Sequence, residues 1–205
     1  MKNVNIVGLI SKKANSPFFT GETLRSIDRL TDKKTIVSEL KKEIELEQVW
    51  KLKKDLYCIN EKYWQRPSSQ YEVALLLEGD SYVTGLAALS YYGLIPEAIF
   101  TTTCFSSNEK SYVNKFGSFF YSKVPPHFLK FGVENKNRCR MSTPLKAILD
   151  YAWQGNHFWQ NRGALLLDLR IDEEDSHKIN FEDLIRYEEA YKNKKMTKIC
   201  EALRE

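Results

Sequence analysis

The sequence has no long apolar segment. Its longest apolar runs, residues 73–77 and 164–167, are far shorter than the ~18–20 residues that a membrane-spanning helix needs. Residues 1–5 have neither the apolar segment nor the small-residue cleavage site of a secretory signal peptide. We therefore expect a cytoplasmic protein that does not contact a membrane.

Side chains that commonly bind metal ions are few and scattered. No two of the 4 cysteines form a C-x-x-C pair, and none of the 3 histidines lies beside a cysteine. A zinc site requires such spacing. We therefore expect no metal and no other cofactor. The cysteines are expected to be free thiols that are buried or partly buried: Cys58, Cys104, Cys139 and Cys200.

Sequence motifs of common enzymes are also missing. The chain contains no G-x-x-x-x-G-K-[ST], no G-x-S-x-G and no H-E-x-x-H. Acidic residues occur at Asp168 and in the run 172–175, which is typical of a solvated turn. His157 is followed by two aromatic residues, which favours a packing role in a loop. We therefore expect a protein that is not an enzyme.

The positive charge is confined to one part of the chain. Hydrophobic residues make up 42% and charged residues 28% of the 205 residues, as in an ordinary globular protein of one or two domains. The net charge is +4. Residues 1–64 contain 13 Lys and Arg against 9 Asp and Glu, whereas the rest of the chain contains 18 of each. This distribution predicts a polyanionic partner for the first third only.

The first third has the pattern of three helices followed by a hairpin. Apolar residues between positions 4 and 10 predict a first helix, Thr20 is a suitable N-cap for a second, and Asp32 for a third. The apolar face of the third helix is expected to contain Ile36, Val37, Leu40 and Ile44. Residues 48–52 and 56–59 flank a basic turn and predict a β-hairpin. We interpret residues 1–64 as a winged helix-turn-helix DNA-binding domain.

The DNA contacts of such a domain come from its third helix and its hairpin tip. The helix enters the major groove, and the tip reaches the backbone or the minor groove. Lysine suits phosphate neutralisation more than base reading, because its ammonium group is a compact point charge. A solvated lysine-rich face and a purely protein-binding winged helix are the alternatives. The residues expected to contact DNA are Lys33, Lys34, Ser38, Lys41, Lys42, Lys53 and Lys54.

The rest of the chain predicts a second, α+β domain over residues 71–205, after a polar linker. Its strands are expected to form a mixed or antiparallel sheet with helices packed against it. Expected strands lie at residues 98–105, 112–116 and 118–122, with edge strands at 128–133 and 138–141. Expected helices lie at residues 71–78, 85–92, 143–152, 181–191 and 195–203, and residues 165–171 fit a strand or a buried helix.

One string in this domain is distinctive. Residues 87–97 read AALSYYGLIPE, and they resemble the SALSYYGLIPE-like segment of the AbiEi family, the antitoxins of type IV abortive-infection toxin–antitoxin systems. A Thr-rich strand, an aromatic FG-x-F-x-Y ribbon and a TPEKALLD-like helix follow in the family's order, at residues 99–105, 116–121 and 143–150. The resemblance covers residues 16–170. Leu145 stands where the family usually has glutamate, and the wing lacks the family's G-x-Y ending.

The resemblance implies a DNA-binding transcriptional autorepressor that is also an antitoxin. In the family, the winged helix binds inverted repeats in double-stranded DNA of its own promoter. The C-terminal domain counteracts a nucleotidyltransferase-like toxin, without a stable complex between the two proteins. For this chain we expect Lys146 and Asp150, which share one helix face, to form an antitoxin surface together with Tyr91 and Tyr92. A surface ion pair without a functional role is the alternative.

Two other functions fit the residues. One is a winged-helix transcriptional regulator with a ligand-sensing C-terminal domain and no toxin partner, which predicts an apolar pocket near Tyr91, Tyr92 and Phe116. The other is a metal-dependent enzyme acting on nucleic acid, with Asp168 and the neighbouring carboxylates as metal ligands.

Overall fold

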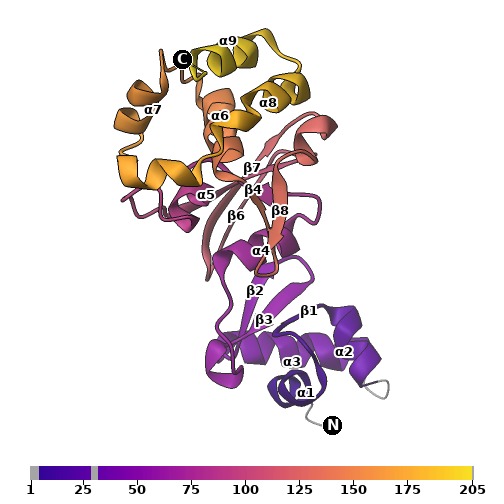
Figure 1. Ribbon diagram of the computed structural model, residues 1–205. Coiled ribbons are helices and arrows are strands. Elements are labelled where there is room, and N and C mark those ends of the chain that lie inside the picture. The colour runs from indigo at the N-terminus through magenta and orange to yellow at the C-terminus, as the bar shows by residue number, and fades with distance from the viewer. Residues whose placement is uncertain (1–4, 29–31, 205) are drawn as a thin grey trace. The chain divides into compact units, whose positions relative to one another are not determined.

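The chain divides into two compact units. The computed structural model describes residues 5–28 and 32–204 (Figure 1). Unit 1 comprises Met1–Ser69 with Tyr112–Phe116, and unit 2 comprises Gln70–Ser111 with Gly117–Glu205. The sequence analysis places residues 112–116 in the second domain, whereas the structure groups them with unit 1. Phe116 packs instead against the rings of Phe18 and Trp50 in unit 1, at centroid distances of 6.3 and 5.8 Å.

Unit 1 combines three helices with a small antiparallel sheet (Figure 1). The helices are α1 (Ile6–Lys13), α2 (Gly21–Ile27) and α3 (Lys33–Glu45). The strands are β1 (Phe18–Phe19), β2 (Val49–Lys53) and β3 (Leu56–Ile59), and their order in the sheet is β1-β3-β2. The three helices and the β2–β3 hairpin agree with the sequence analysis. Strand β1 was not expected, because a two-residue strand has no pattern of its own.

Side-chain caps fix where the helices of unit 1 begin. The Asn5 side chain accepts a hydrogen bond from the backbone of Gly8 at the start of α1. Thr20 and Thr23 form a reciprocal capping box at α2, in which each side chain accepts from the other residue's backbone N–H. The Asp32 carboxylate accepts from the backbone of Lys34 and Thr35 at the start of α3. The predicted N-cap roles of Thr20 and Asp32 are thus confirmed.

Replacing Thr20 by alanine is expected to lower the free energy of unfolding of unit 1 by about 1 kcal/mol, because α2 then loses its capping box. Urea unfolding followed by circular dichroism measures the change. Thr20→Ser keeps the hydroxyl group and serves as the matched control. If Thr20→Ser were as destabilising as Thr20→Ala, the capping account would be wrong.

The core of unit 1 lies between α1, α3 and the sheet. Its buried residues are Ile6, Val7, Ile10, Phe19, Leu24, Ile36, Leu40, Val49 and Ile59. The expectation that Val37 belongs to the apolar face of α3 is wrong, because 58% of its surface is exposed. Ile36 and Leu40 define the buried stripe, and Val37 is rotated by about 100° from Ile36 around the helix axis.

A mixed six-stranded sheet forms the centre of unit 2, and residues 112–114 of its edge strand belong to unit 1. In sheet order its strands are β6 (Lys110–Asn114), β7 (Gly117–Lys123), β5 (Thr101–Ser106), β4 (Tyr82–Val83), β9 (Cys139–Ser142) and β8 (Val133–Lys136). The β4–β5 and β8–β9 pairs are antiparallel, whereas β4–β9 and β5–β7 are parallel. The predicted α+β class with a mixed sheet is confirmed.

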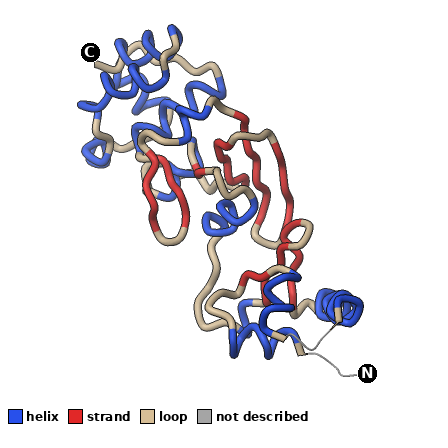
Figure 2. The backbone as a smooth tube through the Cα atoms, turned by 90° about the vertical axis from the view of Figure 1, so that its right-hand side faces the viewer, coloured by secondary structure: helices blue, strands red, loops and turns tan. Residues whose placement is uncertain are grey.

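Most of the helices of unit 2 follow the sheet in sequence, and Figure 2 shows them gathered near the C-terminus. They are α4 (Gln70–Leu77), α5 (Gly85–Tyr91), α6 (Pro144–Gly155), α7 (Arg162–Asp168), α8 (Leu184–Tyr191) and α9 (Lys194–Ala202). The predicted edge strand at 128–133 is wrong. Pro126–Leu129 forms a 3-10 turn, which Pro126 can begin because the first position needs no N–H, and the next strand, β8, begins only at Val133.

Burial of the cysteines agrees with the sequence analysis. Cys58, Cys104, Cys139 and Cys200 are buried, and none of them takes part in a disulfide bond. Burial raises the pKa of the Cys104 thiol above its ordinary value of 9.0. Of the helices in the described ranges, none has the length and apolar character needed to cross a membrane.

Candidate nucleic-acid interface and candidate binding pocket

Helix α3 presents a basic face to solvent. All five of its residues that the sequence predicts to contact DNA are exposed: Lys33, Lys34, Ser38, Lys41 and Lys42. Ile36 and Leu40 turn one face of the helix into the core of unit 1, where each is only 5% exposed, so Lys34, Ser38, Lys41 and Lys42 lie on the opposite face. Lys33 stands three residues before Ile36, on the side of the buried stripe, and it is exposed because it begins the helix.

The charges of this face are compensated unevenly. Lys42 forms an ion pair with Glu39 at 2.8 Å, and Lys41 lies 3.9 Å from the carboxylate of Glu45. The Lys41–Glu45 pair is exposed on both sides, and such pairs are weak, whereas the Glu39 side chain is only 14% exposed. Lys33 and Lys34 take part in no ion pair with any residue of the described ranges. The first turn of α3 thus carries the least compensated positive charge of the helix.

The β2–β3 hairpin positions the remaining two lysines predicted to contact DNA. Lys54 is exposed at the turn, whereas Lys53, at the end of β2, is partly buried. Asp55 has the left-handed backbone conformation that a tight turn requires (φ 56°). Its carboxylate accepts a hydrogen bond of 3.0 Å from the backbone N–H of Gly21, at the start of α2. The turn is therefore fixed to the helices, and Lys54 is presented at a defined place.

The pair Lys146 and Asp150 is not on the surface of unit 2. The two residues are 1% and 0% exposed, so the prediction that they form part of an exposed antitoxin surface is wrong. Lys146 Nζ lies 2.8 Å from Asp150 Oδ1. The prediction that the two residues share one helix face is confirmed, but that face of α6 is buried.

Asp150 is the centre of a buried hydrogen-bond network. One carboxylate oxygen accepts from Lys146 Nζ and from the hydroxyl group of Tyr191. The other accepts from the hydroxyl groups of Tyr82 and Thr84, both at 2.8 Å. Four donors thus satisfy one carboxylate, and they come from β4, α6, α8 and the residue after β4. The network joins three elements that are far apart in the sequence.

Burial perturbs the ionisable groups of this network. It raises the pKa of the hydroxyl groups of Tyr82 and Tyr191 well above 10.0, and the nearby Asp150 carboxylate acts in the same direction. Burial also lowers the pKa of Lys146, and the ion pair with Asp150 opposes that shift. The rings of Tyr191, Tyr82 and Phe128 surround the ammonium group at 4.7 to 5.3 Å from their centroids. These groups are sealed from solvent, which suits a structural role and not catalysis.

Tyr91 and Tyr92 are half-buried at the end of α5. Their rings meet edge to face, with centroids 5.4 Å apart. The hydroxyl group of Tyr91 accepts from the Asn137 side chain at 2.9 Å, and that of Tyr92 donates to the backbone carbonyl of Ser142 at 3.0 Å. Of the four predicted residues of the antitoxin surface, these two alone reach solvent.

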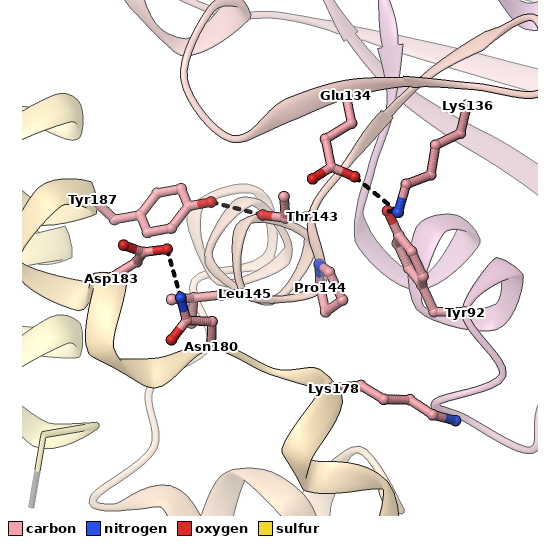
Figure 3. Close-up of a pocket in the computed structure, with 10 residues that line it drawn as sticks. All are labelled: Tyr92, Glu134, Lys136, Thr143, Pro144, Leu145, Lys178, Asn180, Asp183 and Tyr187. Atoms are coloured by element: carbon pink, nitrogen blue, oxygen red, sulfur yellow. Dashed lines mark hydrogen bonds and ion pairs between the residues drawn. The ribbon is translucent and has the colours of Figure 1, made fainter.

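A pocket of about 360 Å³ in unit 2 lies beside Tyr92 (Figure 3). Both polar and apolar groups line it, and the lining residues are Tyr92, Glu134, Lys136, Thr143, Pro144, Leu145, Lys178, Asn180, Asp183 and Tyr187. An apolar pocket was expected near Tyr91, Tyr92 and Phe116, and of these three residues only Tyr92 lines this pocket. Phe116 belongs to unit 1, and the groups beside Tyr92 are charged residues, hydroxyl groups and an amide.

Each charged group of this pocket has a hydrogen-bond or ion-pair partner. Figure 3 shows Lys136 meeting Glu134, and the two side chains lie 2.8 Å apart. This hydrogen bond raises the pKa of Lys136. Lys178 pairs with Asp175 at 2.7 Å, and Asp183 accepts from the Asn180 amide at 2.8 Å. The lining has two cations and two anions, so the pocket offers hydrogen bonds to a small polar molecule but no net charge.

The residues considered for metal binding or catalysis have other contacts. Asp168 accepts a hydrogen bond of 2.9 Å from the indole N–H of Trp159. The imidazole ring of His157 stacks on Tyr151, with centroids 4.2 Å apart, which agrees with the expected packing role. No group of three or more His, Cys, Asp or Glu side chains is arranged to hold a metal ion in the part of the chain that the structure describes.

Sequence reasoning missed the Tyr82, Thr84 and Tyr191 members of the Asp150 network. The residues of α6 did carry a signal, because Lys146 and Asp150 are the only charged residues of a helix that is otherwise almost entirely apolar. A helix that is apolar on nearly all sides is usually buried. Its two charges are then expected to be paired inside the protein.

Comparison with known proteins gives no further identification. None of the models of known protein families matches the chain, and no curated protein matches it significantly.

Proposed function

We propose that the protein is a DNA-binding transcriptional autorepressor and an antitoxin, and that unit 1 is its winged helix-turn-helix. The observation that carries the DNA-binding part is the exposed basic face of α3, with Lys33 and Lys34 in its first turn. Double-stranded DNA is the polyanion that such a helix fits, because its major groove admits one α-helix.

The order of elements in unit 1 supports this proposal. The chain runs α1, β1, α2, α3 and then the β2–β3 hairpin, and the short strand β1 pairs with β3. A winged helix-turn-helix places its recognition helix directly before the hairpin that forms the wing. The exposed Lys54 at the hairpin turn is then the residue that reaches the DNA backbone or the minor groove.

The antitoxin part of the proposal rests on the resemblance of residues 87–97 and the three segments that follow them. Within this string, Ala87, Ala88 and Leu89 are buried in α5, so the resemblance concerns the packing of unit 2 more than its surface. The proposed target is a nucleotidyltransferase-like toxin encoded next to this protein. Co-expression of the two proteins tests this part, and a folded protein that fails to restore growth would refute it.

Binding to the chain's own upstream DNA tests the repressor part. If six lysines of unit 1 contact phosphates, affinity is expected to fall about 10³-fold between 50 and 200 mM salt. A variant with Lys33, Lys34, Lys41 and Lys42 changed to alanine is expected to bind more weakly. The slope of log affinity against log salt concentration should fall by about 3.6, because four phosphate contacts are lost. Fluorescence anisotropy with labelled duplexes measures both quantities.

A matched control removes four exposed lysines from unit 2 instead: Lys123, Lys130, Lys194 and Lys198. This control variant loses the same net charge and is expected to keep the wild-type affinity and salt slope. Equal losses in the two variants would mean that binding reflects net charge alone. Absence of salt-sensitive binding by the folded wild type would refute the repressor.

A ligand-sensing regulator is the second candidate function, and the pocket beside Tyr92 favours it. Its volume of about 360 Å³ is in the range of small-molecule sites. The two candidates differ in one result: a ligand-sensing regulator binds its upstream DNA but does not restore growth in the presence of the toxin.

A further inference from the structure

The most exposed apolar side chain of α3 lies within its basic face. Val37 is 58% exposed, although the residue before it and Leu40 are buried in the core of unit 1. Its exposed neighbours within one helical turn are Lys33, Lys34, Ser38 and Lys41. Packing within unit 1 therefore gives no reason for an apolar residue at this position.

Helix formation gives no reason for valine either. A β-branched side chain loses rotamer freedom in a helix, and a lysine, glutamate or alanine would favour the helix more. The exposed methyl groups of Val37 also lie in water in the free protein. A partner that covers them accounts for their presence, and the lysines around them require that partner to be negatively charged.

The major groove of DNA offers one apolar group that meets these conditions. Among the base edges that face this groove, only thymine carries a methyl group, at C5, and apolar side chains contact it. The lysines of the face suit phosphates, because an ammonium group is a point charge without the fork of arginine. The Ser38 hydroxyl can serve as donor or acceptor, so it discriminates poorly between bases.

The position of Val37 within α3 also fits base contact. It is the fifth residue of a helix that begins at Lys33. In helix-turn-helix proteins the N-terminal residues of the recognition helix meet the base edges. Lys33 and Lys41 lie four residues before and after it, where they can contact phosphates on either side of such a base.

We propose that Val37 is a specificity-determining residue that selects thymine in the DNA site through contact of its methyl groups with the thymine C5-methyl group. This inference rests on the proposed DNA binding of unit 1. It assigns the recognition of one base type to a residue outside the lysine set. The lysines then supply affinity for any sequence, and Val37 supplies part of the discrimination.

Replacement of thymine by deoxyuridine tests the contact, because it removes only the C5-methyl group and leaves every hydrogen-bonding group in place. Duplexes of the bound upstream site are prepared with each thymine changed in turn. For the wild type, one or two positions per site are expected to weaken binding about fivefold. Val37→Ala is expected to bind the unmodified site about fivefold more weakly and to show no further loss at the same positions.

A matched control comes from the end of the same helix. Leu46, at the C-cap of α3, is 63% exposed, and it lies beyond the part of the helix expected to meet base edges. Leu46→Ala is expected to keep the wild-type sensitivity to deoxyuridine. Circular dichroism checks that both variants are folded, which is expected because both changes are on the surface and introduce a good helix former.

The outcomes separate this inference from the proposed function. Specific, salt-sensitive binding that no deoxyuridine weakens would overturn the role of Val37 and leave the repressor intact. Additive losses of binding free energy from Val37→Ala and deoxyuridine would overturn it as well. The effects of removing two groups that contact each other are not additive. Absence of any DNA binding by the folded wild type would overturn both, and Val37 would then be a contact for an acidic protein. Loss of the deoxyuridine effect in Val37→Ala alone supports the inference.

Discussion

Replacing Asp150 by alanine is expected to destabilise unit 2 by about 3–5 kcal/mol, because it leaves a buried charge without its partner. Lys146, which is 1% exposed, would keep its ammonium group in the interior with no carboxylate beside it. The hydroxyl groups of Tyr82 and Thr84 would lose their common acceptor, and a buried donor without an acceptor carries a further cost. Few single changes in unit 2 remove so many interactions at once.

The complementary change, Lys146→Met, keeps the length of the side chain and removes its charge. It leaves the Asp150 carboxylate with three hydroxyl donors, and a loss of several kcal/mol is expected here too. The double variant Lys146→Met with Asp150→Asn contains no unpaired charge. Its loss is therefore expected to be clearly smaller than the sum of the two single losses.

Urea unfolding gives the free energies, and hydrogen exchange shows whether the loss is local to unit 2. Exchange is expected to increase in peptides from β4, α6 and α8, since these elements hold the network. The pair Lys41 and Glu45 provides the control, because both side chains are more than half exposed at the same i, i+4 spacing. Glu45→Ala is expected to cost less than ~0.5 kcal/mol. Equal costs for the buried and the exposed pair would contradict a structural role of the network.

The sequence predicted local features well because local rules govern them. Thr20 and Asp32 cap their helices as expected, since capping depends on residues within one turn. The exposed lysines of α3 follow from the spacing of two core residues on the opposite face. The i, i+4 spacing of Lys146 and Asp150 also predicted correctly that the two residues share one helix face.

What the sequence did not predict depends on segments that are distant along the chain. Asp150 is buried because Tyr82 and Tyr191 pack over it, and they lie 68 and 41 residues away. The placement of Phe116 in unit 1 depends on its contacts with Phe18 and Trp50. In the sequence, these two residues lie before the predicted boundary between the domains and Phe116 lies after it. Val37 illustrates a third limit. An apolar residue at the margin of an amphipathic pattern fits the core or the surface equally, and only the packing of Ile36 and Leu40 decides.

Alkaline pH is the second condition expected to have a large effect on unit 2. Burial raises the pKa of Tyr82 and Tyr191 well above 10.0 and that of Tyr187 to about 12. It raises the pKa of the Cys104 thiol above 9.0 in the same way. Lys146 acts in the opposite direction, because its pKa is lowered by burial. Burial also raises the pKa of the Cys200 thiol, to about 12, so folding favours the protonated form of several thiols and phenols of unit 2 and disfavours that of Lys146.

The sign of the effect follows from proton binding. Below about pH 8 the thiols and the phenols are largely protonated in both states, so their stabilising contribution is fully present. Above pH 10 the unfolded chain has released these protons while the folded unit still holds them. The unfolded state then binds fewer protons, and the free energy of unfolding falls as the pH rises. Each such group contributes about 1.4 kcal/mol per pH unit, and Lys146 offsets one of them while it titrates.

Urea unfolding of the protein at a series of pH values between 8 and 11 measures this dependence. The free energy of unfolding is expected to be nearly constant at the lower end and to fall by several kcal/mol per pH unit above pH 10. Tyr187→Phe removes one titrating group, so its slope is expected to be shallower by about 1.4 kcal/mol per pH unit. Tyrosinate absorbance provides an independent measurement, because the buried phenols are expected to ionise only when unit 2 unfolds. A flat stability profile up to pH 11, or buried phenols that ionise in the folded protein, would show that Tyr82, Tyr187 and Tyr191 are accessible to solvent after all.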